Sequence, residues 1–184
     1  MALTQYYTAT TLDGFIADER HSLDWLFTRD QDRSGPLGYA DFFSGVGALA
    51  MGSTTYEWIL EHALAGKDPA ERRWPYEPPT WVFTHRRLQA VPDADIRFAS
   101  GDVASVHAEM VAAAGERNRW VVGGGDLAGQ FADAGLLDEV IVYVAPVVLG
   151  GGAPLLPRRL ELRLEETARN GDFVVARYSV VRPG

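Results

Sequence analysis

Hydrophobic and polar positions along the chain follow two spacings, one typical of strands and one typical of helices. Residues 3–10 alternate and are rich in aromatic and β-branched side chains, which predicts a first strand that ends at the turn dipeptide Asp13-Gly14. Further strands are predicted at 46–51, 80–84, 96–98, 119–122 and 140–148, and helices at 39–43, 56–65, 103–115 and 127–134.

The order of these elements predicts the fold class. Strands that alternate with helices indicate an α/β fold with a mostly parallel central sheet. Two alternating segments, 160–164 and 173–180, follow at the end of the chain, and Asn170-Gly171 between them favours an antiparallel C-terminal hairpin. The proline-rich segment 66–79 predicts a surface loop. Without repeats or a linker, residues 1–184 are expected to form a single domain.

Composition narrows the classes of function. The chain contains no cysteine, which excludes disulfides, thiol catalysis, thiolate zinc sites and iron–sulfur ligation. The net charge of −8 disfavours binding to nucleic acid. No apolar run approaches the roughly 20 residues of a membrane span, and the first residues lack a basic leader. We therefore expect a cytoplasmic protein that acts on a small molecule, away from membranes and nucleic acid.

Several catalytic motifs are absent from the sequence. There is no nucleophile elbow, no lysine-containing phosphate loop and no metalloprotease helix motif. The four histidines are dispersed, with no second ligand at metal-binding spacing, so no metal site is expected. They are His21, His62, His85 and His107.

Glycines at a strand–helix junction remain as candidate chemistry. Gly123, Gly124 and Gly125 follow a predicted buried strand and precede Asp126 and Leu127 at the start of a helix. Free backbone N–H groups and the helix dipole make such a junction an anion site, and glycine allows close approach. The segment also fits the dinucleotide-binding pattern G-x-G-x-x-[GA], although it comes late in the chain. The alternative is a tight turn that needs glycine for its backbone alone.

Two further strand ends carry polar residues. Hydroxyl groups follow the strand 46–51 and could bind phosphate oxygens or simply cap a helix. An arginine pair follows the strand 80–84 and could clamp a phosphate or simply be solvated. Ligands of open α/β sheets bind beyond the carboxyl ends of strands, so the three segments together suggest a dinucleotide across the sheet edge. The residues concerned are Gly52, Ser53, Thr54, Thr55, Thr84, His85, Arg86 and Arg87.

Six segments resemble a known superfamily. The segments 51–56 (MGSTTY), 82–86 (VFTHR) and 122–131 (VGGGDLAGQF) resemble dihydrofolate reductases. Three others resemble the pyrimidine-reductase branch, the C-terminal domain of the bifunctional deaminase–reductase of riboflavin synthesis. They are 11–17 (TLDGFIA), 135–139 (GLLDE) and 145–152 (APVVLGGG). The resemblance spans nearly the whole chain, and without a deaminase domain the protein looks like a stand-alone member.

The resemblance implies a dihydrofolate reductase-like three-layer fold and NADPH as the cofactor. Gly124, Gly125, Asp126 and Leu127 would hold the pyrophosphate, with the Gly123–Gly124 peptide bond in the cis form. The second helix start would add contacts, and the loop after the strand 80–84 would surround the adenosine and its 2′-phosphate. These further cofactor residues are Gly52, Ser53, Thr54, Thr55, Thr84, His85 and Arg86.

The resemblance also implies a substrate end of the site. Asp13 and Gly14 would lie in the loop over the nicotinamide, and Trp25 would lie at the substrate. Asp41 is the nearest counterpart of the buried carboxylate of folate reductases, so Asp13 and Asp41 are the candidates for a proton relay. Phe15 stands where pyrimidine reductases commonly have lysine, which suggests a flatter and more apolar pocket.

The chain also departs from folate reductases at the cofactor. Ser53 stands where they have a basic residue, so the charge of a 2′-phosphate would fall to Arg86 or Arg87.

The leading hypothesis is an NADPH-dependent oxidoreductase that transfers hydride to a C=N or C=O bond of a heterocycle or ribosylamino-pyrimidine. It would resemble 5-amino-6-(5-phosphoribosylamino)uracil reductase of riboflavin synthesis. The alternatives are a non-catalytic nucleotide-binding module on the same fold, a dihydrofolate reductase-type enzyme and an NAD-dependent Rossmann dehydrogenase. A homodimer is expected as well, because the apolar strand 140–148 and the closing hairpin offer more apolar edge than one small sheet needs.

Overall fold

The computed structural model describes residues 1–64 and 73–182 and contains an eight-stranded sheet. The strand order is β5-β4-β3-β6-β1-β7-β10-β9, and β10 pairs antiparallel with both of its neighbours while the other pairs are parallel. The strands are β1 (Thr4–Thr11), β3 (Val46–Gly52), β4 (Thr80–Phe83), β5 (Ile96–Ala99), β6 (Asn118–Gly123), β7 (Glu139–Ala145), β9 (Leu162–Asn170) and β10 (Phe173–Val180).

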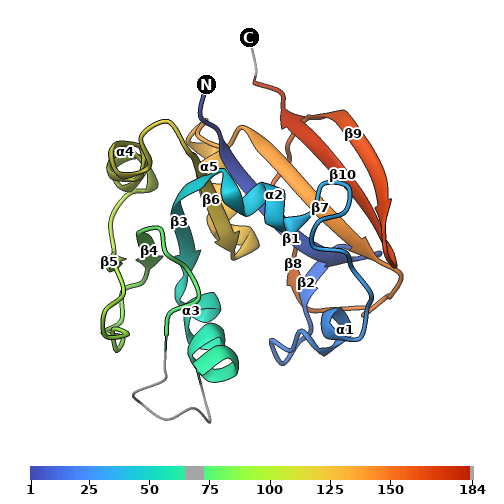
Figure 1. The fold of residues 1–184 in the computed structure, drawn as a ribbon, viewed down its shortest axis with the longest axis horizontal. Coiled ribbons are helices and arrows are strands. Elements are labelled where there is room, and N and C mark those ends of the chain that lie inside the picture. The colour runs from blue at the N-terminus through green and yellow to red at the C-terminus, as the bar shows by residue number, and fades with distance from the viewer. Residues whose placement is uncertain (65–72, 183–184) are drawn as a thin grey trace.

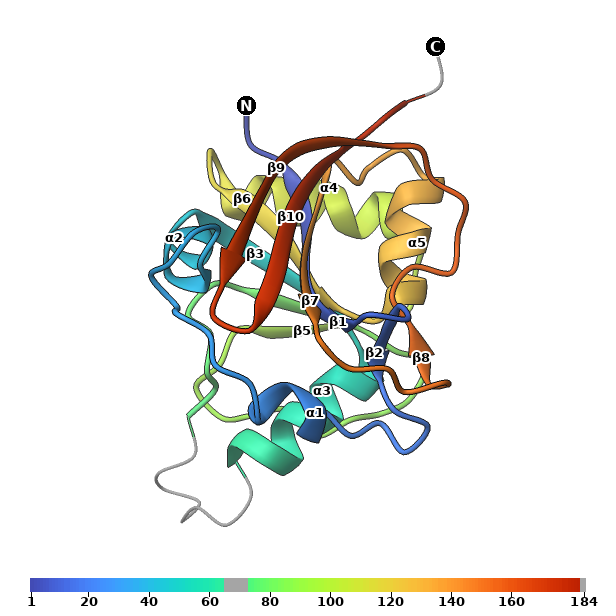
Figure 2. The same ribbon diagram turned by 90° about the vertical axis from the view of Figure 1, so that its right-hand side faces the viewer.

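Helices cover both faces of this sheet, which gives three layers (Figures 1 and 2). The helices α4 and α5 pack on one face, and α1, α2 and α3 lie toward the other. A separate pair of short strands, β2 (Phe15–Ala17) and β8 (Ala153–Pro154), lies at one end of the sheet. The helices are α1 (Asp24–Phe27), α2 (Tyr39–Ser44), α3 (Ser53–Ile59), which continues as the π-helix η1 (Leu60–Leu64), α4 (Val103–Ala114) and α5 (Gly125–Asp133).

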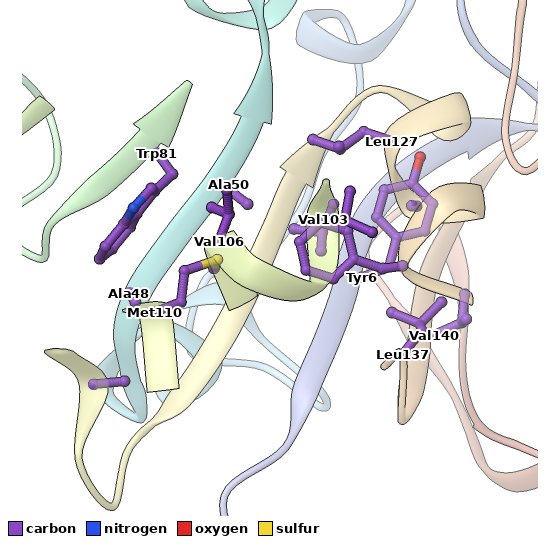
Figure 3. Close-up of a cluster of buried hydrophobic side chains, with 14 of the residues drawn as sticks. Tyr6, Ala48, Ala50, Trp81, Val103, Val106, Met110, Leu127, Leu137 and Val140 are labelled. Atoms are coloured by element: carbon purple, nitrogen blue, oxygen red, sulfur yellow. The ribbon is translucent and has the colours of Figure 1, made fainter. Parts of the chain in front are cut away.

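The central strand β1 shows why three layers form. Tyr6 is fully buried beneath α4 and α5, and Figure 3 shows it within the cluster that includes Met110. Tyr7 points to the opposite face, where it stacks on Phe42 of α2 with ring centroids 4.2 Å apart. Adjacent side chains of a strand point to opposite faces. A strand with large apolar side chains on both faces must therefore be covered on both.

The predicted helix 103–115 is confirmed as α4, which has recognisable ends. The side chain of Asp102 accepts a hydrogen bond from the backbone N–H of Ala104, 3.2 Å away, and so caps the first turn. The helix ends at Gly115, whose positive φ of 60° favours glycine. The buried positions Val103 and Met110 lie on the face that meets the sheet.

Several predicted boundaries are wrong by a few residues. The first hairpin strand is Leu162–Asn170 instead of 160–164, so the two-residue turn is Gly171-Asp172, with Gly171 at a φ of 58°. Local alternation could not locate this strand, because most of β9 is exposed on both faces. The helix predicted at 127–134 begins two residues earlier, and β7 ends before Pro146. Of the predicted loop 66–79, residues 66–72 lie outside the described residues.

Two kinds of feature are absent from the described residues 1–64 and 73–182. None of the helices there is long and apolar enough to cross a membrane. Within the same ranges, no group of three or more histidine, aspartate or glutamate residues is arranged to hold a metal ion.

The cluster beneath α4 predicts the effect of one substitution. Met110 is fully buried, so Met110→Ala should lower the free energy of unfolding by about 2–5 kcal/mol, because it leaves a cavity. Val111, the next residue of α4, is 39% exposed, and Val111→Ala should change the free energy by less than about 0.5 kcal/mol. Urea unfolding followed by circular dichroism measures both. Equal losses for the two variants would contradict this assignment of the core.

Candidate functional site

The parallel register brings three strand ends to one edge of the sheet. Gly52 at the end of β3 pairs with Phe83 at the end of β4, and Met51 pairs with Gly123 at the end of β6. The starts of α3 and α5 and the loop after β4 therefore lie at the same edge, as the sequence predicted for the three polar segments. Figure 1 shows α3, α1 and the β2–β8 pair gathered at this edge, and both termini at the other.

A cleft of about 320 Å³ opens at this edge. Its floor is formed by the strands β1 and β6, one wall by the first turns of α3 and α5, and the other wall by β2, β8 and the segments that follow them. The lining residues are Thr8, Ile16, Ala17, His21, Leu23, Thr54, Thr55, Trp58, Val122, Gly123, Gly124, Gly125, Asp126, Ala153, Pro154 and Pro157.

The three consecutive glycines have different physical roles. A Cβ on Gly123 would lie 2.6 Å from Thr55 Oγ1, and a Cβ on Gly125 would overlap the carbonyl oxygens of Pro154 and Leu155. Close packing therefore requires glycine at these two positions. Gly124 has a φ of 91°, and a Cβ there would make only ordinary contacts. The tight-turn reading is thus correct for the backbone of Gly124 and does not conflict with an anion site.

The helix starts that face the cleft have no side-chain caps. No side chain of the described residues bonds the first N–H groups of α3 or α5, whereas Asp102 caps α4. The first intrahelical bond of α5 joins the N–H of Ala128 to the carbonyl of Gly124, so the N–H groups of Gly125, Asp126 and Leu127 precede it. Uncapped N–H groups at the positive end of a helix dipole attract anions.

Asp126 brings a negative charge to this helix start, and Arg158 pairs with it. The Arg158 guanidinium donates to Asp126 over 2.9 Å and to Asp133 over 2.8 Å, along one side of α5. Hydrogen bonds from Gln130 and Arg158 hold the pKa of Asp126 below its usual value. The carboxylate is therefore ionised at neutral pH, and it shares the single positive charge of Arg158 with Asp133.

The loop after β4 lies at the same edge but does not line the cleft. Thr84 Oγ1 accepts the backbone N–H of Arg86, which closes a short turn. The Arg86 guanidinium forms a two-pronged ion pair with Glu57 of α3, at 2.6 and 3.0 Å, and this contact raises the pKa of Arg86. Arg86, one of the predicted cofactor residues in this loop, is thus paired with a carboxylate of the protein. Thr84 and His85 stay at the edge beside it.

Asp13 and Gly14 fix the turn between β1 and β2 beside the cleft and do not line it. The Asp13 carboxylate accepts hydrogen bonds from Thr11 Oγ1 at 2.6 Å and from the N–H groups of Gly150 and Leu149 at 2.7 and 3.2 Å. These bonds, that from Thr11 first, lower the pKa of Asp13. A carboxylate held ionised in this way is a poor proton donor at neutral pH.

The structure places the other two predicted substrate-end residues away from the cleft. Trp25 is 9% exposed and packs among Ile141, Tyr143 and Phe173. It is therefore a core residue, since its ring covers the sheet instead of a ligand. Asp41 is exposed on α2 and does not line the cleft, which corrects its assignment as a buried carboxylate.

The predicted cis peptide bond is also corrected. The described residues contain no cis peptide bond, so Gly123–Gly124 is trans. The turn into α5 is made instead by the positive φ of Gly124.

Several lining residues escaped the sequence analysis. Trp58 could have been found, because it follows Thr54 and Thr55 at helical spacing and so shares their face of α3. His21 and Leu23 lie in an irregular segment without periodicity. Pro154 lines the cleft because β8 pairs with β2, which lies about 140 residues earlier in the chain. No local sequence pattern indicates this pairing.

The hydrogen bonds of Asp13 predict a pH-dependent stability. Because the folded-state pKa is lowered, the contribution is present above the unfolded pKa, near 4, and is lost as the pH falls through the folded value. Asp13→Asn should lower the melting temperature by a few degrees at pH 7, and the difference from the unmodified protein should shrink below pH 4. Thermal unfolding across this pH range checks it, with Asp41→Asn as the exposed control. A difference independent of pH would contradict the assignment.

Comparison with known proteins supports one family. The RibD C-terminal domain family matches residues 4–174. Uncharacterized protein YwjB of Bacillus subtilis is 33% identical over 179 residues, which cover 95% of this chain and 96% of YwjB. Uncharacterized protein YyaP of the same organism is 26% identical over 172 residues, covering 91% of this chain and 88% of YyaP.

Solved structures show the same fold. A protein from Shewanella sp. PV-4, named "Putative riboflavin biosynthesis protein", has a TM-score of 0.78 and 26% identity, covering 99% of this chain and all of its own. The deaminase–reductase of Thermotoga maritima has a TM-score of 0.65 and 16% identity, covering 98% of this chain but 57% of its own. The shared fold is the dihydrofolate reductase-like fold, here with a C-terminal antiparallel hairpin. By its sequence and its fold, the chain belongs to the RibD C-terminal domain family.

Proposed function

We propose that this protein is an NADPH-dependent reductase of a small heterocyclic compound. One observation carries the proposal: the cleft lies where the uncapped starts of α3 and α5 meet at the carboxyl edge of the sheet. Membership of the RibD C-terminal domain family supports it, because that family includes reductase domains. The Thermotoga maritima relative is described as a 5-amino-6-(5-phosphoribosylamino)uracil reductase, which suggests a pyrimidine-type ring as the substrate.

The chain offers a fitting cradle for the cofactor. In this proposal the N–H groups of Gly125, Asp126 and Leu127 bind the pyrophosphate, since three adjacent donors converge at the start of α5. Leu127 contributes only its backbone, because its side chain is buried in the core. Thr54 and Thr55 add hydroxyl donors from the start of α3 on the same wall, while Gly123 and Gly124 allow close approach. Gly52 and Ser53 lie at the same helix start.

The adenosine end would lie along the loop after β4. Arg86 and Arg87 are the cations of this loop available for a 2′-phosphate, and a contact with Arg86 would replace or share its ion pair with Glu57. Thr84 and His85 lie beside Arg86 at the same edge and would contact the adenosine.

The protein's part in the reaction is to position the cofactor and the substrate and to exclude water from them. A bound nicotinamide nucleotide supplies hydride to the carbon of a C=N or C=O bond, whose nitrogen or oxygen then takes one proton. His21 and Asp126 are the titratable side chains that line the cleft among the described residues. Asp126 is held ionised, so we propose His21, or water beside it, as the proton source in place of Asp13 and Asp41.

Measuring NADPH binding to a Gly124 variant tests the proposal. A methyl group at Gly124 would lie 4.0 Å from Leu127 N, close to the proposed anion-binding N–H groups, so Gly124→Ala should weaken NADPH binding by about tenfold or more. Gly115→Ala is the matched control, because Gly115 also has a positive φ but ends α4 on the other side of the molecule. Titration calorimetry measures both, with circular dichroism to confirm folding. A protein that binds no NADPH at millimolar concentration would refute the proposal.

We also propose that two copies associate through the C-terminal hairpin. The edge strand β9 is exposed along most of its length, and Leu164 and Val174 are 54% and 58% exposed. Most other side chains of β9 are polar or charged, but the unpaired backbone N–H and C=O groups of a bare edge strand can pair with another chain. Sedimentation velocity should therefore show a dimer, and Leu164→Glu should shift it toward monomer, whereas Glu161→Gln should not. A monomer at all concentrations would contradict this interpretation.

A further inference from the structure

The two walls of the cleft differ in chemistry. The wall opposite α3 is apolar, and it is built by β2, by β8 and by the segments that follow each of them. Its residues are Ile16, Ala17, Leu23, Ala153, Pro154 and Pro157. The pairing of β2 with β8 places two of these segments side by side, so the wall is continuous. Such a surface favours the apolar ring of a ligand over a hydrated ionic group.

Trp58 extends the apolar surface onto α3, and its plane is held in place. Its ring stacks on His62 with centroids 4.3 Å apart and planes at 10°, and on Phe27 at 5.8 Å and 11°. Phe27 belongs to α1 and His62 to η1, so the stack ties α1 to the α3 side of the cleft. A ligand thus meets a preorganised aromatic side chain, which loses little conformational entropy on binding.

The indole nitrogen of Trp58 has an unused hydrogen bond. Its Nε1 is buried and has no partner among the described residues. Among the described residues, the other buried side-chain atoms without a hydrogen-bond partner belong to Gln5, Trp25, Arg29 and Arg177. None of these four residues lines the cleft, whereas Trp58 does. A buried N–H without an acceptor is unfavourable, because the hydrogen bond it made to water in the unfolded chain is not replaced. In the proposal below, a small shift of the Trp58 ring on ligand binding would bring this N–H to an oxygen or nitrogen of the ligand.

The charges around the cleft argue against a phosphate on the substrate. Among the described residues that line it, Asp126 is the charged side chain, and no lysine or arginine is present. At its margins, Arg158 is paired with Asp126 and Asp133. Arg86, paired with Glu57, would serve the 2′-phosphate of the cofactor in this proposal. A phosphate monoester needs charge-assisted donors, and in this proposal the donors at the start of α5 are occupied by the cofactor. Among the described residues, the remaining part of the cleft offers no arginine or lysine as a counterion, and His21 is the side chain there that can carry a positive charge.

From these observations we infer that the substrate is an uncharged conjugated ring without a phosphate group, selected by Trp58 and the apolar wall. This inference rests on the proposed reductase function and deepens it. It departs from the phosphoribosyl substrate for which the Thermotoga maritima relative is described. Hydride from NADPH and one proton would add across a C=N or C=O bond of the ring or of the group attached to it, so the substrate would gain two electrons and NADPH would become NADP⁺.

A matched pair of ligands tests the charge preference. 5-Amino-6-(ribosylamino)uracil and its 5′-phosphate share the ring and differ in the phosphate, and lumazine serves as a second uncharged ring. Calorimetry with the NADP⁺-bound protein should show the uncharged form binding about tenfold tighter or more than the phosphate, and kcat/KM should follow the same order. Tighter binding of the phosphate, or binding of neither uncharged ring, would overturn the inference. Failure of the proposed function is separate, because it appears as the absence of NADPH binding.

Variants of Trp58 test its role. Trp58→Ala should weaken binding of the preferred uncharged ring by about tenfold or more while NADPH affinity changes by less than about threefold. Trp58→Phe keeps an aromatic ring but loses the N–H donor. Its affinity for the uncharged ring should therefore lie between that of the unmodified protein and that of Trp58→Ala. Trp74→Phe is the control, because Trp74 bonds Thr80 Oγ1 outside the cleft lining. Quenching of tryptophan emission by the ring should persist in the Trp74 variant and decrease in Trp58→Phe. Unchanged ring affinity in Trp58→Ala would overturn the role of Trp58.

Discussion

The parallel pairing of β6 with both β1 and β3 is the constraint on which the site depends. This register aligns the carboxyl end of β6 with that of β3, and the pairing of β3 with β4 extends the alignment to the next strand. The helix starts after β3 and β6 then face one cleft, although about 70 residues separate them in the chain. Buried side chains on both faces of β1 and β3 hold the register, since a slip of one residue would turn apolar groups to the wrong face.

Close packing at the strand–helix junctions transmits that register to the cleft. Gly123 lies against Thr55, and Gly125 lies against the carbonyls of Pro154 and Leu155, so a side chain at either position would separate the walls. The segment after β8 is in turn held by Arg158, which bridges two aspartates of α5. The wall that contains β8 is thus held against α5 by the close contact at Gly125 and by the ion pairs of Arg158. A cleft built in this way is largely preformed and needs little rearrangement to bind a ligand.

Local charge balance explains how an acidic chain could bind an anionic dinucleotide. The overall charge of −8 opposes such binding at long range. At the start of α5, however, Arg158 offsets part of the charge of Asp126, and the uncapped N–H groups are close to the proposed anion site. The same balance leaves no free cation among the described residues at the apolar wall. In the proposed function, one cleft would therefore combine an end that binds the anionic cofactor with an end suited to an uncharged ring.

Most of the fold could be predicted from the sequence, because local periodicity reflects local burial. The parallel α/β class, the helix over 103–115 and the three glycine or hydroxyl segments at one sheet edge follow from such patterns. The substrate end could not be predicted in this way. Trp25 and Trp58 are both tryptophans on short helices, yet one fills the core and the other lines the cleft. The sequence alone determined which segments approach the edge of the sheet. Only the tertiary structure decided which side chains face the cleft, because β2, β8 and Trp58 are brought together by contacts between residues distant in the chain.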